Sequence, residues 1–110
     1  MIVTPSRAPY NPYHIMIVSK RHVALLSELT QKESKELFVL IGKWNGLLHT
    51  SHKNVLTYLK DWSFGKTIEH FHVHLIPDTH LWSKELSDAR DFLTLKSFIK
   101  TTDAIRNKFL

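Results

Sequence analysis

The stretch His70-Phe71-His72-Val73-His74-Leu75-Ile76-Pro77 places three histidines at alternate positions, with apolar residues between and after them. Side chains of a β-strand alternate between its two faces, so an extended backbone here projects the three imidazoles to one side and Phe71, Val73 and Leu75 to the other. A helix would scatter the histidines over more than half of its circumference. We therefore predict a strand over residues 68–76, ended by Pro77, that carries its imidazoles on one face and core residues on the other.

Length and composition indicate a folded protein of one domain. The chain has 110 residues, of which 43% are hydrophobic and 23% charged, which suits a single domain over residues 1–110. It has no cysteine, which excludes disulfides, thiolate metal sites and a cysteine nucleophile. The first residues do not resemble a secretory signal, and no apolar run has the length of a membrane span. We expect a soluble, cytoplasmic protein with no membrane partner.

The charge balance favours anionic partners of small size. The formal net charge is +5, yet the basic residues are scattered and never form a run of five. A nucleic-acid-binding face usually gathers its lysines and arginines in a patch or stripe. We therefore expect a solvated basic surface, with no nucleic-acid partner.

The rest of the chain predicts an α+β fold with an antiparallel sheet. Thr30 and Glu33 have the spacing of a capping box, and apolar residues follow at steps of three and four, so we predict a helix over residues 31–49 that covers one face of the sheet. Phe38, Leu40 and Trp44 are assigned to the core.

Three further strands and a second helix complete this prediction. Residues 1–3 and 13–19 are rich in β-formers and flank a proline-rich turn, which suggests a hairpin, and residues 55–59 form another apolar strand. Apolar residues near the end of the chain predict a C-terminal helix: Phe98, Ile99, Ile105 and Phe109.

Three clustered imidazoles can bind a metal, attack phosphorus or move protons. A zinc site is possible for histidines at alternate strand positions, but cysteine is absent, and of the adjacent carboxylates Glu69 is predicted on the opposite face. Metal binding is thus the minority hypothesis, and we expect no metal. The residues alone leave the other two chemistries open.

The chain resembles the histidine-triad, or HIT, family. That family is defined by His-φ-His-φ-His-φ-φ, where φ is apolar, and residues 70–76 satisfy every position. A separate segment, Pro9-Tyr10-Asn11-Pro12-Tyr13-His14 followed by an apolar strand and Ser19-Lys20-Arg21-His22, is similar to a second conserved region of the family. This form, together with the Glu69-His70 pair, points to the bacterial-type dinucleoside polyphosphate branch. The resemblance covers about residues 1–77.

The resemblance implies a HIT-like sheet built as a homodimer, and attack on the α-phosphorus of a small nucleotide substrate without a cofactor. It assigns His72 as the nucleophile that forms a nucleotidyl-histidine intermediate, resolved by water or another acceptor. His74 would contact the non-bridging phosphate oxygens and assist the leaving group. His70 and His14 would set tautomer and orientation, and Thr67 matches a family hydroxyl that hydrogen-bonds phosphate. Hydrogen-bond donors held in position, rather than a metal ion, would stabilise the charge that develops at the phosphorus.

Departures from the family pattern concern nucleotide binding more than chemistry. Lys66 stands where relatives often have glutamine or glycine, and it would hold phosphate as a point charge. Ser6 stands where an aspartate or asparagine commonly binds the ribose, and it would make one weaker hydrogen bond. Leu59 or Lys60 falls near a position that asparagine or glutamine often holds. The amino-terminal segment that supplies walls for the base in many relatives is expected to be missing. Two alternatives therefore remain beside the enzyme: a HIT-fold binding or regulatory module with poor turnover, and a histidine-cluster metalloprotein.

Overall fold

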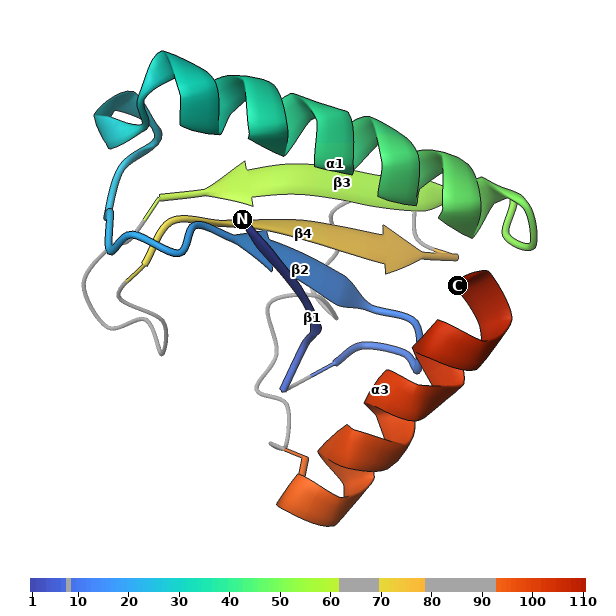
Figure 1. Ribbon diagram of the computed structural model, residues 1–110. Coiled ribbons are helices and arrows are strands. Elements are labelled where there is room, and N and C mark those ends of the chain that lie inside the picture. The colour runs from blue at the N-terminus through green and yellow to red at the C-terminus, as the bar shows by residue number, and fades with distance from the viewer. Residues whose placement is uncertain (8, 62–69, 79–92) are drawn as a thin grey trace.

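A computed structural model describes residues 1–7, 9–61, 70–78 and 93–110. Within these ranges, four strands and two α-helices follow one another, with a short 3-10 helix after the second strand (Figure 1). They are β1 (Ile2–Pro5), β2 (Ile15–Val18), η1 (Leu26–Glu28), α1 (Gln31–His49), β3 (Val55–Lys60), β4 (His72–Pro77) and α3 (Leu95–Phe109). The α+β class, the β1–β2 hairpin and the C-terminal helix are as predicted.

The four strands form one antiparallel sheet in the order β1-β2-β4-β3. The histidine strand β4 therefore lies between β2 and β3, although β3 is its neighbour in the described sequence and β2 is more than fifty residues away. In this register His74 stands opposite Met16 and Tyr58, and His72 stands opposite Val18 and Lys60. Partners directly opposite each other share a face of the sheet, so the register decides which side chains surround the histidines.

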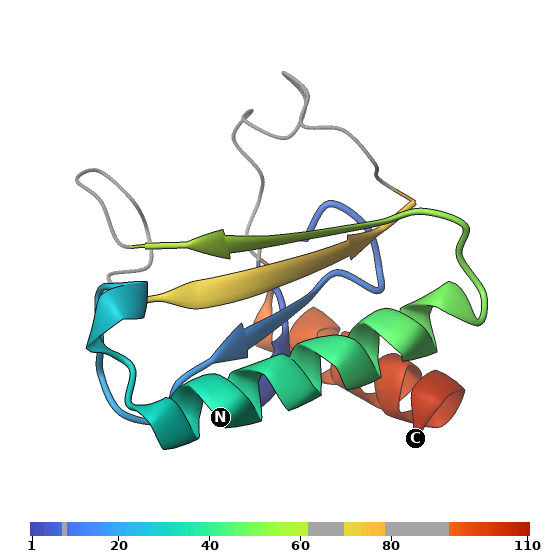
Figure 2. The ribbon, with the colours of Figure 1, turned by 90° about the horizontal axis from the view of Figure 1, so that it is seen from above.

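Both helices cover the same face of the sheet (Figures 1 and 2). α1 packs across β2, β3 and β4, and α3 packs against β1. The core between these layers includes residues from β2 and β4, from both helices, and from the segments that follow β2 and precede β4: Ile15, Ile17, Val23, Leu37, Trp44, Leu48, Phe71, Val73, Leu75 and Ile105. Val73 and Leu75 alternate with His72 and His74 along β4, so the two histidines belong to the opposite face.

Helix α1 has the predicted boundaries and the predicted cap. The Thr30 side chain accepts a hydrogen bond from the Glu33 amide, and the Glu33 carboxylate accepts one from the Thr30 amide. The core assignment of Phe38 is wrong, since its side chain is 75% exposed. Leu37 and Trp44 are buried on the side of the helix that faces the sheet. Phe38 lies about 100° from Leu37 around the helix axis, so its side chain points away from the sheet.

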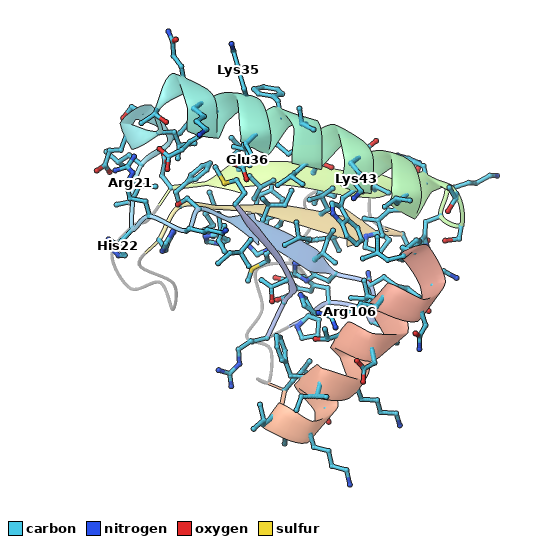
Figure 3. The ribbon with its side chains drawn as sticks, viewed as in Figure 1. Arg21, His22, Lys35, Glu36, Lys43 and Arg106 are labelled. Carbon is cyan, nitrogen blue, oxygen red and sulfur yellow. The ribbon has the colours of Figure 1, made fainter. Side chains whose placement is uncertain are left out.

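The connection from β2 to α1 is fixed by an ion pair. Arg21 donates to the carboxylate of Glu33 at 2.8 Å and to the backbone carbonyl of Glu28 at 2.7 Å. Figure 3 shows Arg21 and His22 together at this end of the molecule, near the start of α1. The bond from Arg21 is the main cause that lowers the pKa of Glu33 to about 2. Arg21 thus connects the loop to α1 while its side chain stays half exposed, in agreement with the solvated basic surface that we expected.

Strand β4 differs from the predicted strand at its start. It begins at His72, and His70 and Phe71 precede it with non-strand backbone; residues 68 and 69 lie outside the described residues. It ends at Pro77, which pairs with Val55 at the edge of the ladder, as the missing proline N–H allows. Neither described helix is long and apolar enough to cross a membrane.

Candidate active site

Two imidazoles lie side by side on the sheet face opposite α1 and α3. His72 and His74 are two residues apart in β4, so they share this face, and their ring centroids are 4.6 Å apart. They are 4% and 5% exposed. Two buried imidazoles in edge contact need defined tautomers, because each ring nitrogen must either donate or accept.

The tautomer of His74 follows from its contact with His14, a fully buried residue that immediately precedes β2. The backbone amide of Tyr10 donates to His14 Nδ1 at 3.2 Å, so neutral His14 carries its proton on Nε2. That Nε2 lies 2.8 Å from His74 Nδ1 and donates to it. His74 therefore accepts at Nδ1 and carries its own proton on Nε2.

His72 has the opposite arrangement. Its Nδ1 lies 2.8 Å from the backbone carbonyl oxygen of His70, and a carbonyl can only accept. The proton of neutral His72 is therefore on Nδ1, and Nε2 keeps its lone pair. Two adjacent imidazoles thus offer complementary groups: an N–H donor from His74 and a nucleophilic nitrogen from His72.

Burial keeps all three imidazoles neutral at physiological pH. It lowers the pKa of His14 to about 4, with a smaller contribution from His72. It lowers the pKa of His74 to about 2, and neighbouring imidazoles and Lys60 add to this effect. The pKa of His72 is also lowered, chiefly by burial, against the opposing effect of its bond to the His70 carbonyl. Neutral imidazole is the form that can attack an electrophile.

His70, the first member of the motif, makes different contacts from the other two. It lies at a bend before β4, and its Nε2 is 2.9 Å from the hydroxyl of Ser19, while the ring of His22 meets it edge-on at 5.1 Å. The side chain of His70 thus lies against the end of β2, and its backbone carbonyl serves His72. Within the described ranges, no three His, Asp or Glu side chains are arranged as a metal site.

Two residues of β3, Tyr58 and Lys60, border the cluster. The family pattern points near Lys60, whereas nothing in the sequence singles out Tyr58. The Tyr58 ring stacks on His74 at 4.8 Å, with the ring planes 20° apart, and burial raises the pKa of its phenol to about 12. Lys60 stands opposite His72 in the ladder, and its positive charge lowers the pKa of that histidine. The alternation of residues 55–60 puts Tyr58 and Lys60 on one face, but only the β3–β4 register shows that it is the histidine face.

The predicted substrate-binding residues are only partly covered by the structure. Ser6 is buried directly after β1, and its amide donates to the backbone carbonyl of His14 at 3.0 Å. It therefore extends the β1–β2 ladder by one pair and lies close to the histidine cluster. Thr67 and Lys66 lie outside the described residues.

A protein-family model covers most of the chain. The model of the HIT domain matches residues 2–81, which include the hairpin, α1 and the whole histidine motif. Among curated proteins, the chain is 37% identical over 73 residues to an AP-4-A phosphorylase of Mycobacterium tuberculosis. This match covers 63% of the chain and 37% of that protein, so the chain corresponds to little more than a third of this relative.

Solved structures agree on the fold. The NitFhit protein of Caenorhabditis elegans superposes with a TM-score of 0.71 at 22% identity, over 96% of this chain and 24% of that one. A diadenosine triphosphate hydrolase of Plasmodium falciparum, solved in complex with cyclomarin A, superposes with a TM-score of 0.68 at 16% identity. That alignment covers 98% of this chain and 72% of the other. At these identities the likeness establishes a shared fold.

Proposed function

This chain belongs to the HIT domain family, and from that premise we propose that it cleaves nucleotides at the α-phosphate, with His72 as the nucleophile. The observation that carries the proposal is the opposite polarity of the two central imidazoles. His72 Nδ1 is held by a carbonyl and so leaves Nε2 free to attack, whereas His74 Nδ1 accepts from His14 and so leaves an Nε2–H to donate. One nitrogen can attack phosphorus while its neighbour binds the oxygens that gain charge.

The proposed reaction proceeds in two displacements. In the first, the Nε2 lone pair of His72 forms a bond to the α-phosphorus, the bond from that phosphorus to the bridging oxygen breaks, and the leaving phosphate departs with the electron pair. In the second, water or inorganic phosphate attacks the same phosphorus, and the N–P bond breaks with its electrons returning to Nε2. A water nucleophile releases its proton to the solvent. The nucleotidyl-imidazolium between the two steps keeps its Nδ1–H on the His70 carbonyl.

Charge stabilisation falls to the residues around His72. The Nε2–H of His74 donates to a non-bridging phosphate oxygen, and His14 holds that tautomer by its own bond to Nδ1. Lys60 stands beside His72 and adds a positive charge for the same oxygens. Ser6, Thr67 and Lys66 stay predicted contacts to ribose and phosphate.

We propose dinucleoside polyphosphates as the first substrates to test, followed by nucleoside phosphoramidates. A polyphosphate leaves as a stable anion, which suits a site whose histidines are neutral and donate hydrogen bonds. The curated relative from M. tuberculosis is named for phosphorolysis of such a compound, which supports inorganic phosphate as a candidate acceptor beside water.

The test compares wild type, His72→Ala and His49→Ala, an exposed histidine in the last turn of α1, with diadenosine polyphosphates and an adenosine phosphoramidate, with and without inorganic phosphate. Chromatography of the products identifies the acceptor. Attack by water on the α-phosphorus releases a nucleoside monophosphate, whereas attack by inorganic phosphate releases a nucleoside diphosphate in its place. We expect product from at least one substrate, loss of activity in His72→Ala and near-normal activity in His49→Ala. Equal rates in wild type and His72→Ala would refute the nucleophile.

Two alternatives give different results in the same experiment. A HIT-fold binding module would bind nucleotide by calorimetry without product or covalent intermediate. A histidine-cluster metalloprotein would purify with bound metal and lose its activity in excess chelator. Mass spectrometry of the protein after a brief reaction tests for the nucleotidyl-histidine directly.

We also propose that the chain forms a homodimer through the outer face of α1. Phe38 and Val39 are 75% and 70% exposed on this helix, although both are large and apolar. Figure 3 shows Lys35, one turn before Phe38, pointing away from the sheet. An apolar pair on the outside of a helix is suited to burial against a second copy of the same helix in a twofold contact.

A further inference from the structure

A buried serine at the end of β2 connects this strand to the residue that holds the nucleophile. Ser19 is 3% exposed, and its Oγ lies 2.7 Å from the backbone carbonyl of Arg21 and 2.9 Å from Nε2 of His70. Since the carbonyl can only accept, the hydroxyl proton of Ser19 points to Arg21. The lone pair of Ser19 then accepts from His70, whose proton is thereby fixed on Nε2.

The same histidine supplies the carbonyl that sets the tautomer of His72. That carbonyl belongs to the peptide unit between His70 and Phe71, and the amide of this unit donates to the carbonyl of Val23 at 2.8 Å. A trans peptide is planar, with its C=O and N–H pointing in opposite directions. Holding the amide toward Val23 therefore directs the carbonyl of His70 away from Val23, toward Nδ1 of His72.

One further restraint is needed to fix this peptide plane. The bond to Val23 opposes rotation of the plane about the line through the Cα atoms of His70 and Phe71, but it does not hold those two Cα atoms in place. Phe71 is restrained by its side chain in the core, and His70 is restrained by the bond from its ring to Ser19 and by the edge of His22. Ser19 is the described hydrogen-bond partner of that ring, so its loss frees one end of the unit.

We infer that Ser19 is a positioning residue for the proposed reaction: through His70 it keeps the lone pair of His72 on Nε2. The inference rests on the proposed function for its kinetic consequence, whereas its structural consequence is independent of turnover. Without the serine hydroxyl, the Cα atom of His70 loses this restraint, and the bond between Nδ1 of His72 and the His70 carbonyl weakens. The proton of His72 is then free to move to Nε2, which removes the lone pair from the attacking position.

The direct test observes the tautomer of His72 by nitrogen-proton correlation spectra of protein labelled with ¹⁵N in histidine, without substrate. Wild type should show His72 protonated on Nδ1, and the signal is assigned by its loss in His72→Ala. In Ser19→Ala a substantial fraction should shift to the Nε2–H form. Ser19→Thr keeps a hydroxyl and should retain the wild-type tautomer, and the exposed Ser27→Ala is the matched control.

Kinetics then connect the tautomer to the reaction. We expect Ser19→Ala to lower kcat by about tenfold, the effect of losing one buried hydrogen bond, with little change in KM. Ser19→Thr should restore most of the lost kcat. A wild-type His72 protonated on Nε2 would overturn the inference even if the enzyme is active. So would a Ser19→Ala protein whose His72 tautomer is unchanged, whatever its rate. An inactive wild type with the expected tautomer shift would refute the proposed function and leave the positioning role supported.

Discussion

The Nε2 atom of His14 lies 2.8 Å from Nδ1 of His74, and this contact leaves Nε2 of His74 as a hydrogen-bond donor. The direction of the bond is set by a backbone group, since the amide of Tyr10 donates to the other nitrogen of His14. Because a backbone amide can only donate, it determines which nitrogen donates and which accepts in the bonds from Tyr10 to His14 and from His14 to His74. The hairpin therefore supports the site as well as carrying its own strands.

Replacing His14 should show that its Nε2–H is the part that matters. His14→Ala leaves Nδ1 of buried His74 without its partner, and we expect turnover to fall roughly ten- to a hundredfold. His14→Gln places an amide N–H near the lost Nε2–H and should keep more activity than His14→Ala. Steady-state kinetics on whichever substrate the product assay identifies measure this order. Equal loss in both variants would show that the donor has no role.

The stability of the protein should fall when the solution is acidified below pH 6.5. The pKa of His14 is about 4 in the folded chain against an ordinary value of 6.5, so the unfolded chain binds the extra proton between these values. This stabilisation is complete above pH 6.5 and is lost as pH falls toward 4, with a size on the order of 3 kcal/mol for His14. His74 acts in the same direction.

Urea denaturation at a series of pH values measures this effect. His14→Gln removes one of the titrating groups, so its free energy of unfolding should depend less steeply on pH between 4 and 6.5. Identical slopes in the two proteins would contradict the low pKa of His14.

Neutralising Lys60 should change the pH dependence of the reaction. The charge of Lys60 lowers the pKa of His72, so Lys60→Gln should raise that pKa and move the acid limb of the kcat/KM profile to higher pH. KM should also rise, because a positive charge near the phosphates is lost. Lys35→Gln, on the outer face of α1, is the matched control. A profile that does not move would remove Lys60 from the site.

The helix cap should be measurable as a loss of stability. Thr30→Ala removes the side-chain oxygen that accepts from the Glu33 amide, and we expect the free energy of unfolding to fall by about 1 kcal/mol. Ser27→Ala, an exposed substitution nearby, should change it little. Chemical denaturation of the three proteins tests this, and a Thr30→Ala protein as stable as wild type would show that the cap is not important.

The exposed phenylalanine of α1 should decide the oligomeric state. Phe38→Glu puts a charge into the proposed twofold contact and should shift the protein from dimer to monomer in sedimentation velocity. Leu95→Glu, an equally exposed apolar position on α3, should leave the dimer intact. A monomeric wild type, or a dimer insensitive to Phe38→Glu, would refute the proposed interface.

Local patterns predicted the elements well because each depends on neighbouring residues. The alternation from His72 to Leu75 requires a strand with two different faces, and the Thr30–Glu33 spacing fixes the start of α1. The error at Phe38 has the same local origin. Apolar spacing defines a broad stripe, and only contact with the sheet shows which part of the stripe is buried.

The sequence by itself determined the histidine strand, the capped helix, the hairpin and the family. Only the tertiary structure decided that β4 inserts between β2 and β3, which brings His14 to His74, Ser19 to His70, and Tyr58 and Lys60 to the histidine pair. The physical reason is the range of the interactions. Strand alternation and helix caps act over a few residues, whereas strand register and the tautomers that it imposes come from contacts between segments up to sixty residues apart.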